Sequence, residues 1–331
     1  MSSQTHHNVN KITVEILDIL ADVQKAMSSK EIAEFLKDRG ISLDPRTVRY
    51  HLTKMEKEGL IAKAYDGKRT ITKRGLEELR RSSVFERLGE FSERIEYNIY
   101  ASDFDIYTLK GSVPTNIAII DKKFSDEALS ILVEIGEKLN ILVSNKIAIA
   151  DEDERLGTIN ILKNKFGIAV ISNTIYDVIM RGVGVFMLTE FAGLLSFENY
   201  KPRGLVELIS YSGLTLSPGW LFIKSGLTSV YKLLEGSGNI ITAIRSFSKQ
   251  AIDIVRKEIE IAKTKGFGGV VTISHPSDKT FSLPPGNRAR VLIAAGLNYL
   301  APLQELGLNP ELKINETLIN FKEFKEPEYF V

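Results

Sequence analysis

The chain has 331 residues, of which 44% are hydrophobic and 26% are charged, and it contains no cysteine. This length suits about two domains, and the composition is ordinary for soluble globular protein. The absence of cysteine excludes disulfides, thiolate nucleophiles and thiolate metal ligands. No apolar run approaches the roughly 18 residues of a membrane span, and the N-terminus lacks the apolar segment of a signal peptide. We therefore expect a cytoplasmic protein with no membrane contact and a disordered tail over residues 1–10.

The charge is unevenly distributed along the chain. Residues 1–83 hold 16 Lys and Arg against 12 Asp and Glu, which is a net charge of +4. The remainder holds 27 against 30, which is a net charge of −3. A basic N-terminal segment on a mildly acidic body is typical of an anion-binding head on a larger platform.

Residues 11–74 show the order of elements of a winged helix-turn-helix domain. Apolar residues at helical spacing predict a first helix over residues 12–23. Ser28 and Glu31 are spaced as a capping box for a second helix, whose expected buried side chains are Ile32, Phe35 and Leu36. That helix is expected to end near residue 40, a glycine.

The third helix of this domain is expected to begin at Asp44-Pro45, because Asp caps a helix well and Pro loses no hydrogen bond at the first helical position. A buried stripe is expected along it, formed by Val48, Leu52 and Met55. Alternating residues on both sides of Asp66-Gly67 then predict a β-hairpin. Helices followed by a hairpin are the winged-helix order.

A basic face on the third helix and the basic hairpin are assigned to DNA. The side chains expected at the major groove and the phosphates are Arg46, Thr47, Arg49, Tyr50, Thr53, Lys54, Lys68 and Arg69. A charged helix face is more often only a solvated face, and some winged helices bind protein. DNA binding is favoured here because the basic face falls on the helix that the motif order places in the groove.

An amphipathic pattern rich in Glu and Arg follows, and it predicts a helix from residue 73 to about residue 97. We expect its part over residues 75–97 to connect the head to the body. Since single heads bind DNA weakly and dimers read two half-sites, a role in a homodimer is favoured over a simple connector.

Residues 98–325 alternate short apolar runs with helical stretches, which indicates a second domain of mixed α/β or α+β class. Strands are expected at 117–120, 147–149, 157–162, 168–171, 240–244, 269–273 and 290–294, and helices at 125–139, 173–181, 251–265 and 297–306. Glycines between the apolar runs mark either ordinary turns or close approach to a ligand.

The body shows little sign of catalytic chemistry. None of the four histidines stands at metal-binding spacing from another His or carboxylate, and no phosphate loop or nucleophile elbow is present. A sensor domain without catalysis is therefore favoured over an enzyme, with no metal and no resident cofactor expected. At the end of an apolar strand, Arg245 is expected either to clamp a ligand carboxylate or to pair with an internal Asp or Glu.

Several stretches of the sequence form one recognisable set. In the head they begin at Ser28, Asp44 and Ile71. In the body they are residues 211–223, 227–230, 236–247, 266–271 and 295–307. In these stretches and their order the chain resembles the NrpR family of archaeal repressors of nitrogen assimilation genes. Two departures are visible: Ser217 stands where the family has an acidic residue before proline, and one regulatory domain is present where many relatives carry two.

The resemblance implies a homodimeric repressor that binds double-stranded operator DNA and releases it when 2-oxoglutarate accumulates. The candidate ligand residues by motif position are Thr228, Ser229 and Arg245. The alternative is a constitutive DNA-binding protein or co-repressor. In that case the body mediates assembly, with the basal transcription machinery among the possible partners, and it senses a different metabolite or none. An enzyme with an appended DNA-binding head is the third hypothesis.

Overall fold

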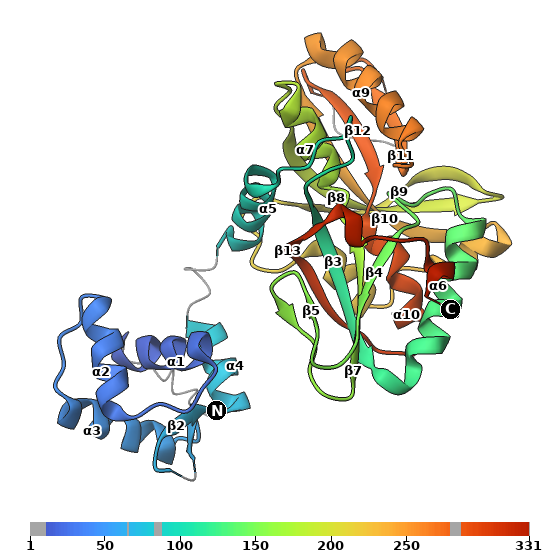
Figure 1. Cartoon of the computed structure of the whole chain (residues 1–331). Coiled ribbons are helices and arrows are strands. Elements are labelled where there is room, and N and C mark those ends of the chain that lie inside the picture. Colours follow the sequence, from blue (N-terminus) through green and yellow to red (C-terminus); the bar gives the residue numbers. More distant parts are fainter. Residues whose placement is uncertain (1–10, 65, 83–87, 279–285, 331) are drawn as a thin grey trace, which may run out of the picture. The chain divides into compact units, whose positions relative to one another are not determined.

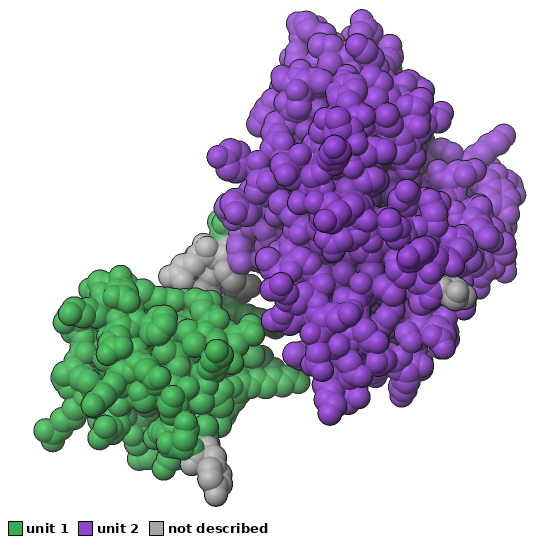
Figure 2. All heavy atoms as spheres, viewed as in Figure 1, with its two compact units in different colours: residues 1–88 green, residues 89–331 purple. Residues whose placement is uncertain are grey.

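The computed structural model describes residues 11–64, 66–82, 88–278 and 286–330. The chain divides into two compact units, Met1–Leu88 and Gly89–Val331 (Figure 2). The tail expected over residues 1–10 lies outside the described residues. Among the helices of the described part of the chain, none is long and apolar enough to cross a membrane.

The N-terminal unit has the predicted winged-helix order (Figure 1). Its strands pair as an antiparallel hairpin, and Met27 adds an antiparallel bridge to Arg69. The elements are α1 (Lys11–Val23), α2 (Ser29–Asp38), α3 (Pro45–Lys57), β1 (Ile61–Lys63), β2 (Arg69–Ile71) and α4 (Lys73–Ser82).

Local capping and one apolar core stabilise this unit. The capping box at the start of α2 is confirmed, since Ser28 N donates to Glu31 and Glu31 N donates to the Ser28 hydroxyl. The expected burial of Phe35 is wrong, because its side chain is 43% exposed. The buried stripe of α2 consists of Ile32, Ala33 and Leu36, whose directions span about 100° of the helix, and Phe35 points outside that arc.

The prediction of a single helix over residues 75–97 is also wrong. Helix α4 ends at Ser82, and the chain turns at Leu88 and Gly89 before α5 (Glu90–Ala101) begins. Gly89 has a φ of +83°, a left-handed conformation that interrupts a right-handed helix. The part of the prediction over residues 83–87 lies outside the described residues. Helix α4 belongs to the first unit and α5 to the second.

Within the described residues, the second unit is built on sheets with strand orders β13-β3-β7-β4 and β11-β12-β10-β8-β9 (Figure 1). Every observed strand pairing is antiparallel, so the mixed class that we expected is α+β. The strands are β3 (Ser112–Asp121), β4 (Ile147–Ala150), β7 (Lys165–Ile171), β8 (Leu188–Glu198), β9 (Lys201–Ser210), β10 (Gly238–Phe247), β11 (Val270–Ser274), β12 (Ala289–Ala294) and β13 (Glu311–Asn320), with a small hairpin of β5 (Arg155–Leu156) and β6 (Ile159–Asn160).

Helices cover both sheets of this unit. The α-helices after α5 are α6 (Ser125–Lys138), α7 (Ile175–Gly182), α8 (Pro218–Lys224), α9 (Ile252–Thr264) and α10 (Ala301–Glu305). Short 3-10 helices are η1 (Lys122–Phe124), η2 (Tyr231–Glu235), η3 (Lys249–Ala251), η5 (Gly296–Tyr299), η6 (Phe321–Glu323) and η7 (Pro327–Tyr329). The helix expected at 297–306 is therefore split into η5 and α10, and the strand expected at 157–162 is reduced to β6.

The central strands are buried on both faces. On β3, Ile117 joins one apolar core and Ala118 joins another, and on β10 Ile244 and Phe247 divide in the same way. The sequence of a strand with both faces covered is a continuous apolar run, rather than an alternation of apolar and polar residues. This explains why β3, β7 and β10 stood out in the sequence, whereas the more exposed β9 did not.

Candidate DNA-binding surface and effector cleft

The start of α3 fixes the direction of its basic face. Asp44 is the N-cap, and its Oδ1 accepts hydrogen bonds from the backbone N–H groups of Arg46 and Thr47 at 2.8 and 3.0 Å. Pro45 occupies the first helical position, as predicted. The stripe predicted at positions 48, 52 and 55 is buried. The opposite side of the helix is therefore turned toward solvent.

Most of the candidate DNA-binding side chains of α3 lie on this exposed side. Arg46, Arg49, Thr53 and Lys54 are exposed, and Tyr50 is 71% exposed. An exposed tyrosine beside three cations is available for base edges and phosphates. The five side chains form a surface that we call the α3 face.

The hydroxyls of the two candidate threonines are already engaged. Thr47 Oγ1 donates to Asp44 Oδ2 at 2.7 Å, so this side chain serves the helix cap. Thr53 Oγ1 donates to the carbonyl of Arg49 at 2.9 Å. A hydroxyl oxygen retains acceptor capacity after donating, so Thr53 keeps a polar group on the α3 face.

The two candidate residues of the hairpin differ in how tightly their side chains are held by neighbouring groups. Lys68 is loosely paired, with its Nζ 3.4 Å from Glu31 Oε1. Arg69 is more tightly held, because its Nε lies 3.1 Å from Glu56 Oε2 and its Nη1 donates to the carbonyl of Gly67. Lys63, which pairs with Arg69 across the hairpin, is an exposed cation that the sequence analysis did not single out. Lys63 is the cation of β1, and its charge beside the basic hairpin is the signal that could have identified it.

The second unit contains a cleft of about 850 Å³. It lies between α5, the end of α7, the first half of β8 and the turn after β9. The side chains that line it are mostly apolar, with a few charged groups among them. Its lining includes Ser92, Ile95, Glu96, Ile99, Tyr100, Asp177, Arg181, Phe186, Thr189, Glu190, Phe191, Tyr211 and Ser212.

Arg245 lies directly behind one wall of this cleft. Its Nε donates to both carboxylate oxygens of Asp177, at 2.9 and 3.1 Å, and its guanidinium carbon lies 5.7 Å from the centre of the Tyr211 ring. Of the two roles expected for Arg245, internal pairing is the one observed. Burial raises the pKa of Asp177, and the positive charge of Arg245 opposes that rise.

Thr228 and Ser229 do not share a site with Arg245. Ser229 is hydrogen-bonded to Asn239 near the start of β10, whereas Arg245 is near the end of that strand. Six residues of a strand separate these positions by about 20 Å. The three ligand candidates therefore do not form one pocket, and only Arg245 contacts residues that line the cleft.

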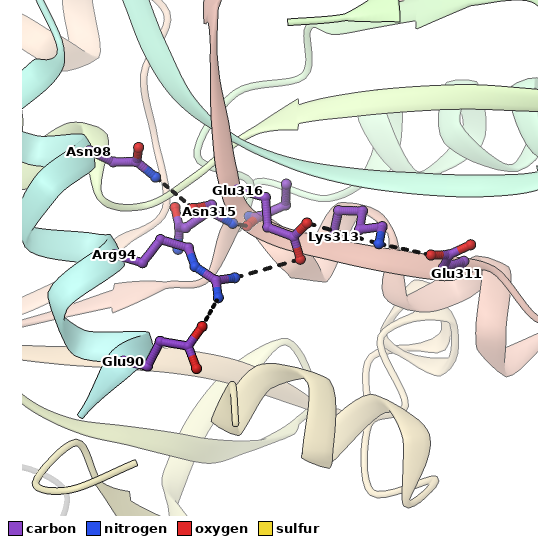
Figure 3. Close-up of polar contacts among 8 residues, drawn as sticks. Glu90, Arg94, Asn98, Glu311, Lys313, Asn315 and Glu316 are labelled. Atoms are coloured by element: carbon purple, nitrogen blue, oxygen red, sulfur yellow. Dashed lines mark hydrogen bonds and ion pairs between the residues drawn. The ribbon is translucent and has the colours of Figure 1, made fainter. Parts of the chain in front are cut away.

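A network of polar contacts joins α5 to β13 (Figure 3). Asn98 Nδ2 donates to the carbonyl of Asn315 at 2.6 Å, and both residues are buried. On the same side, Arg94 lies 3.1 Å from Glu90 and 3.6 Å from Glu316. Asn315 sits at a register shift of β13, with a φ of +51°. In this network the helix is thereby joined to β13 by one buried hydrogen bond and by the ion pair between Arg94 and Glu316, while Glu90 pairs with Arg94 within the helix.

The other end of α5 is held by Arg181 of α7. Its Nη1 donates to the carbonyls of Ile99 and Tyr100, the latter at 2.7 Å, and its Nη2 donates to the carbonyl of Ser102 at 2.7 Å. The last carbonyls of a helix lack partners within the helix, and a cation there is also favoured by the helix dipole. Arg181 thus acts as the C-terminal cap of α5.

One departure noted in the sequence has a simple local explanation. Ser217, which stands before Pro218 in place of an acidic residue, is the N-cap of α8 and accepts a hydrogen bond from the backbone of Trp220 at 3.3 Å. Ser and Asp are about equally good N-caps. The exchange therefore preserves the start of the helix.

Comparison with known proteins identifies both units. Residues 88–326 match the family model of NrpR regulatory domains NRD1 and 2, and residues 14–79 match that of the ribonuclease R winged-helix domain. The fold is similar to the crystal structure of a nitrogen repressor-like protein from Methanococcus jannaschii. That match has a TM-score of 0.59 at 23% identity and covers 71% of this chain and 97% of that one.

Three relatives are named as regulators. The chain is 26% identical over 320 residues to the global nitrogen regulator NrpRI of Methanosarcina mazei, covering 96% of this chain and 98% of that protein. It is 28% identical to the global nitrogen regulators NrpR of Methanococcus maripaludis and Methanocaldococcus jannaschii, covering 76% and 90% of this chain. It spans only 44% and 52% of those two proteins. Because the regulatory-domain model matches more than half of its length, this chain belongs to the NrpR family and is a regulator rather than an enzyme.

Proposed function

We propose that this protein is a DNA-binding repressor of nitrogen assimilation genes that 2-oxoglutarate releases from operator DNA. The observation that carries the proposal is the α3 face, an exposed basic and aromatic surface on the recognition helix of a winged helix. The relatives are named global nitrogen regulators, and this name supports nitrogen assimilation genes as the targets.

In this proposal the recognition helix reads bases and the hairpin holds the backbone. Arg49 and Tyr50 lie midway along α3, where side chains reach base edges in the major groove. Arg46 and Lys54 lie one turn to either side and contact phosphates. Lys68 of the hairpin, with Lys63 opposite Arg69, adds non-specific attraction to the duplex.

We also propose that the protein acts as a homodimer. One recognition helix per chain reads one half-site, and two helices on one face of the duplex read half-sites about 34 Å apart. Sedimentation of the free protein and of its complex with a two-half-site duplex tests this stoichiometry. One chain per operator in both measurements would contradict the dimer.

The proposed function is tested by fluorescence anisotropy on a labelled promoter duplex from a nitrogen assimilation gene. We expect specific binding that is stronger than binding to a scrambled duplex, and release as 2-oxoglutarate is added at fixed ionic strength. Glutamate, which carries an ammonium in place of the keto group, serves as the control ligand. Operator binding that is unchanged by 2-oxoglutarate would overturn the effector and favour the constitutive regulator instead.

A further inference from the structure

The regulatory unit contains two copies of one structural repeat, which run from β3 to α7 and from β10 to α10. In the first copy β3 pairs with β7, with Thr115 opposite Ile171, and in the second β10 pairs with β12, with Thr242 opposite Ala294. Each of these central strands leads through a short 3-10 helix, η1 or η3, into a long helix, α6 or α9. The interval from Thr115 to Thr242 equals the interval from the start of α6 to the start of α9, so the positions of the two helices correspond one to one.

Two reciprocal hydrogen bonds show the same correspondence. Tyr176 of the first copy donates from its hydroxyl to the carbonyl of Gly268 in the second, at 2.7 Å. Tyr299 of the second copy donates in the same way to the carbonyl of Asn145 in the first, at 3.0 Å. Because the copies exchange equivalent contacts, each helix serves as an internal control for the other.

Helices α6 and α9 bury the same positions but differ beside the buried face. The shared positions are Ala128, Leu132 and Ile135 on α6 and Val255, Ile259 and Ala262 on α9. Leu129 of α6 is 5% exposed, whereas at the equivalent position of α9 the side chain of Arg256 is 59% exposed. An exposed cation at this position is therefore not a requirement of the repeat, because α6 occupies the same place without it.

Cations line the outer surface of α9, which lies at the outside of the regulatory unit (Figure 1). Arg256 and Lys263 are two helical turns apart, so their side chains point to the same side at a spacing of roughly 10 Å. The exposed charges of α6, by contrast, are mostly acidic and include Asp126, Glu127 and Glu137. The exposed cations of α9 and of the residues that flank it form a surface that we call the α9 stripe, which consists of Lys249, Arg256, Lys257, Lys263 and Lys265.

The acids of α9 neutralise little of this charge. Asp253 and Glu260 are exposed beside the stripe, and Asp253 lies 3.9 Å from Arg256 with its own side chain 99% exposed, so that this pair contributes little. The carboxylate of Glu258 is buried, and the hydroxyl of Tyr107 donates to it at 2.8 Å. Among the described residues, no acid lies within ion-pair distance of the four lysines of the stripe. A positive surface therefore stands on a unit whose sequence from residue 84 onward has a net charge of −3.

This surface has the chemistry of a phosphate contact rather than of a protein interface. Protein interfaces are enriched in aromatic residues and depleted in lysine, whereas most members of the α9 stripe are lysines and the helix carries no aromatic residue. Lysine contacts phosphates as a mobile point charge that reads no sequence. A duplex carries one negative charge per about 1.7 Å of its axis, so a row of cations along a helix meets phosphates in many relative positions.

The regulatory unit is tethered to the unit that carries the α3 face, because both belong to one chain. A tethered second site acts at a high effective concentration, so contacts too weak to hold DNA alone add to the affinity of the whole chain. We propose that the α9 stripe contacts phosphates of the duplex that flanks the operator. This inference rests on the proposed function for its ligand, DNA, but it requires neither 2-oxoglutarate nor a dimer.

The length of the duplex separates this contact from operator recognition. Fluorescence anisotropy compares the shortest promoter duplex that is still preferred over its scrambled version with the same duplex extended by about 20 base pairs of arbitrary sequence on each side, roughly 70 Å of helix. We expect the wild type to bind the longer duplex more tightly and with a steeper salt dependence. The stripe variant Lys249→Gln/Arg256→Gln/Lys263→Gln should lose this preference, and its slope of log affinity against log salt on the longer duplex should fall by up to about three. Its affinity for the shorter duplex should be unchanged.

Matched variants control for total charge and for the fold. The control variant Lys123→Gln/Lys138→Gln/Lys322→Gln removes three exposed cations elsewhere on the regulatory unit, and it should bind both duplexes like the wild type. Exchanging Lys for Arg and Arg for Lys at the same three positions of the stripe keeps the charge and should keep the preference for the longer duplex. Thermal melts should show little change in any of these variants, because exposed side chains contribute little to stability.

The proposal would be overturned if the stripe variant kept the wild-type preference for the longer duplex, or if the control variant lost as much of it. Equal weakening on both duplexes would also contradict a flanking contact. If no promoter duplex is preferred over its scrambled version, the proposed function fails, and the stripe is then tested on the long scrambled duplex at low salt. Weaker binding of the stripe variant than of the control variant would still support the stripe there, whereas equal binding, or no binding by the wild type, would refute it.

Discussion

Arg245→Met should destabilise the regulatory unit by about 3–5 kcal/mol, because it leaves a buried carboxylate without its counter-ion. The side chains of Arg245 and Asp177 are 0% and 3% exposed, so water cannot replace the lost partner without rearrangement. Methionine has a similar length and is apolar, so little of the effect comes from lost packing. The double variant Arg245→Met/Asp177→Leu removes both charges, and it should be within about 1 kcal/mol of the wild type or more stable.

The destabilisation should depend on pH in a defined direction. Burial raises the pKa of Asp177, and in Arg245→Met the opposing charge is gone. A carboxyl whose folded-state pKa exceeds its unfolded value of about 3.9 favours folding of the neutral form. The penalty is therefore absent below about pH 4 and grows as the pH rises through the raised pKa.

Urea unfolding followed by tryptophan fluorescence measures this effect in one unit. Trp220 is the only tryptophan in the sequence and it lies on α8, so its signal reports the regulatory unit. The variants are compared at about pH 4.5 and about pH 7.5, with Arg203→Met as the control. The buried ion pair would be refuted if Arg245→Met lowered the free energy of unfolding by less than about 1 kcal/mol at neutral pH. It would also be refuted if the decrease were larger in acid than at neutral pH.

Three further predictions concern the N-terminal unit. Arg49→Ala should weaken operator binding by about 1–3 kcal/mol, whereas Lys68→Ala should weaken all duplexes alike and lower the slope of log affinity against log salt by about one, both measured by anisotropy. Gly75→Ala should lower the melting temperature of this unit, because a Cβ there would lie 2.0 Å from a backbone carbonyl oxygen, too close for any side-chain adjustment to relieve. The pKa of Asp44 is lowered by hydrogen bonds from Thr47, so its stabilisation should persist above about pH 4 and disappear as the pH falls through that lowered pKa. Thermal melts of Asp44→Asn, an uncharged cap, should lack this acid-dependent loss.

The winged helix could be predicted from the sequence because its signals are local. The capping box of Ser28 and Glu31 and the start of α3 at Asp44-Pro45 depend on residues within one helical turn. The wrong prediction at Phe35 shows the limit of such local signals. Helical spacing identifies an apolar stripe, but it does not specify how wide the buried part of that stripe is. The break between α4 and α5 was missed for a related reason, because an amphipathic pattern continues through Gly89 whether or not the helix does.

The candidate effector site depended on contacts between distant residues. Arg245 was singled out as an arginine at the end of an apolar strand, but its partner Asp177 is 68 positions away, and Asn98 meets Asn315 across 217 positions. No periodicity in the sequence encodes such pairings, because they are set by which helix packs against which strand in the folded unit. The sequence by itself determined the capped helices, the basic α3 face and the family. Only the tertiary structure decided that Thr228 and Ser229 lie far from Arg245 and that Arg181 faces the same cleft, because packing brings those groups together or keeps them apart.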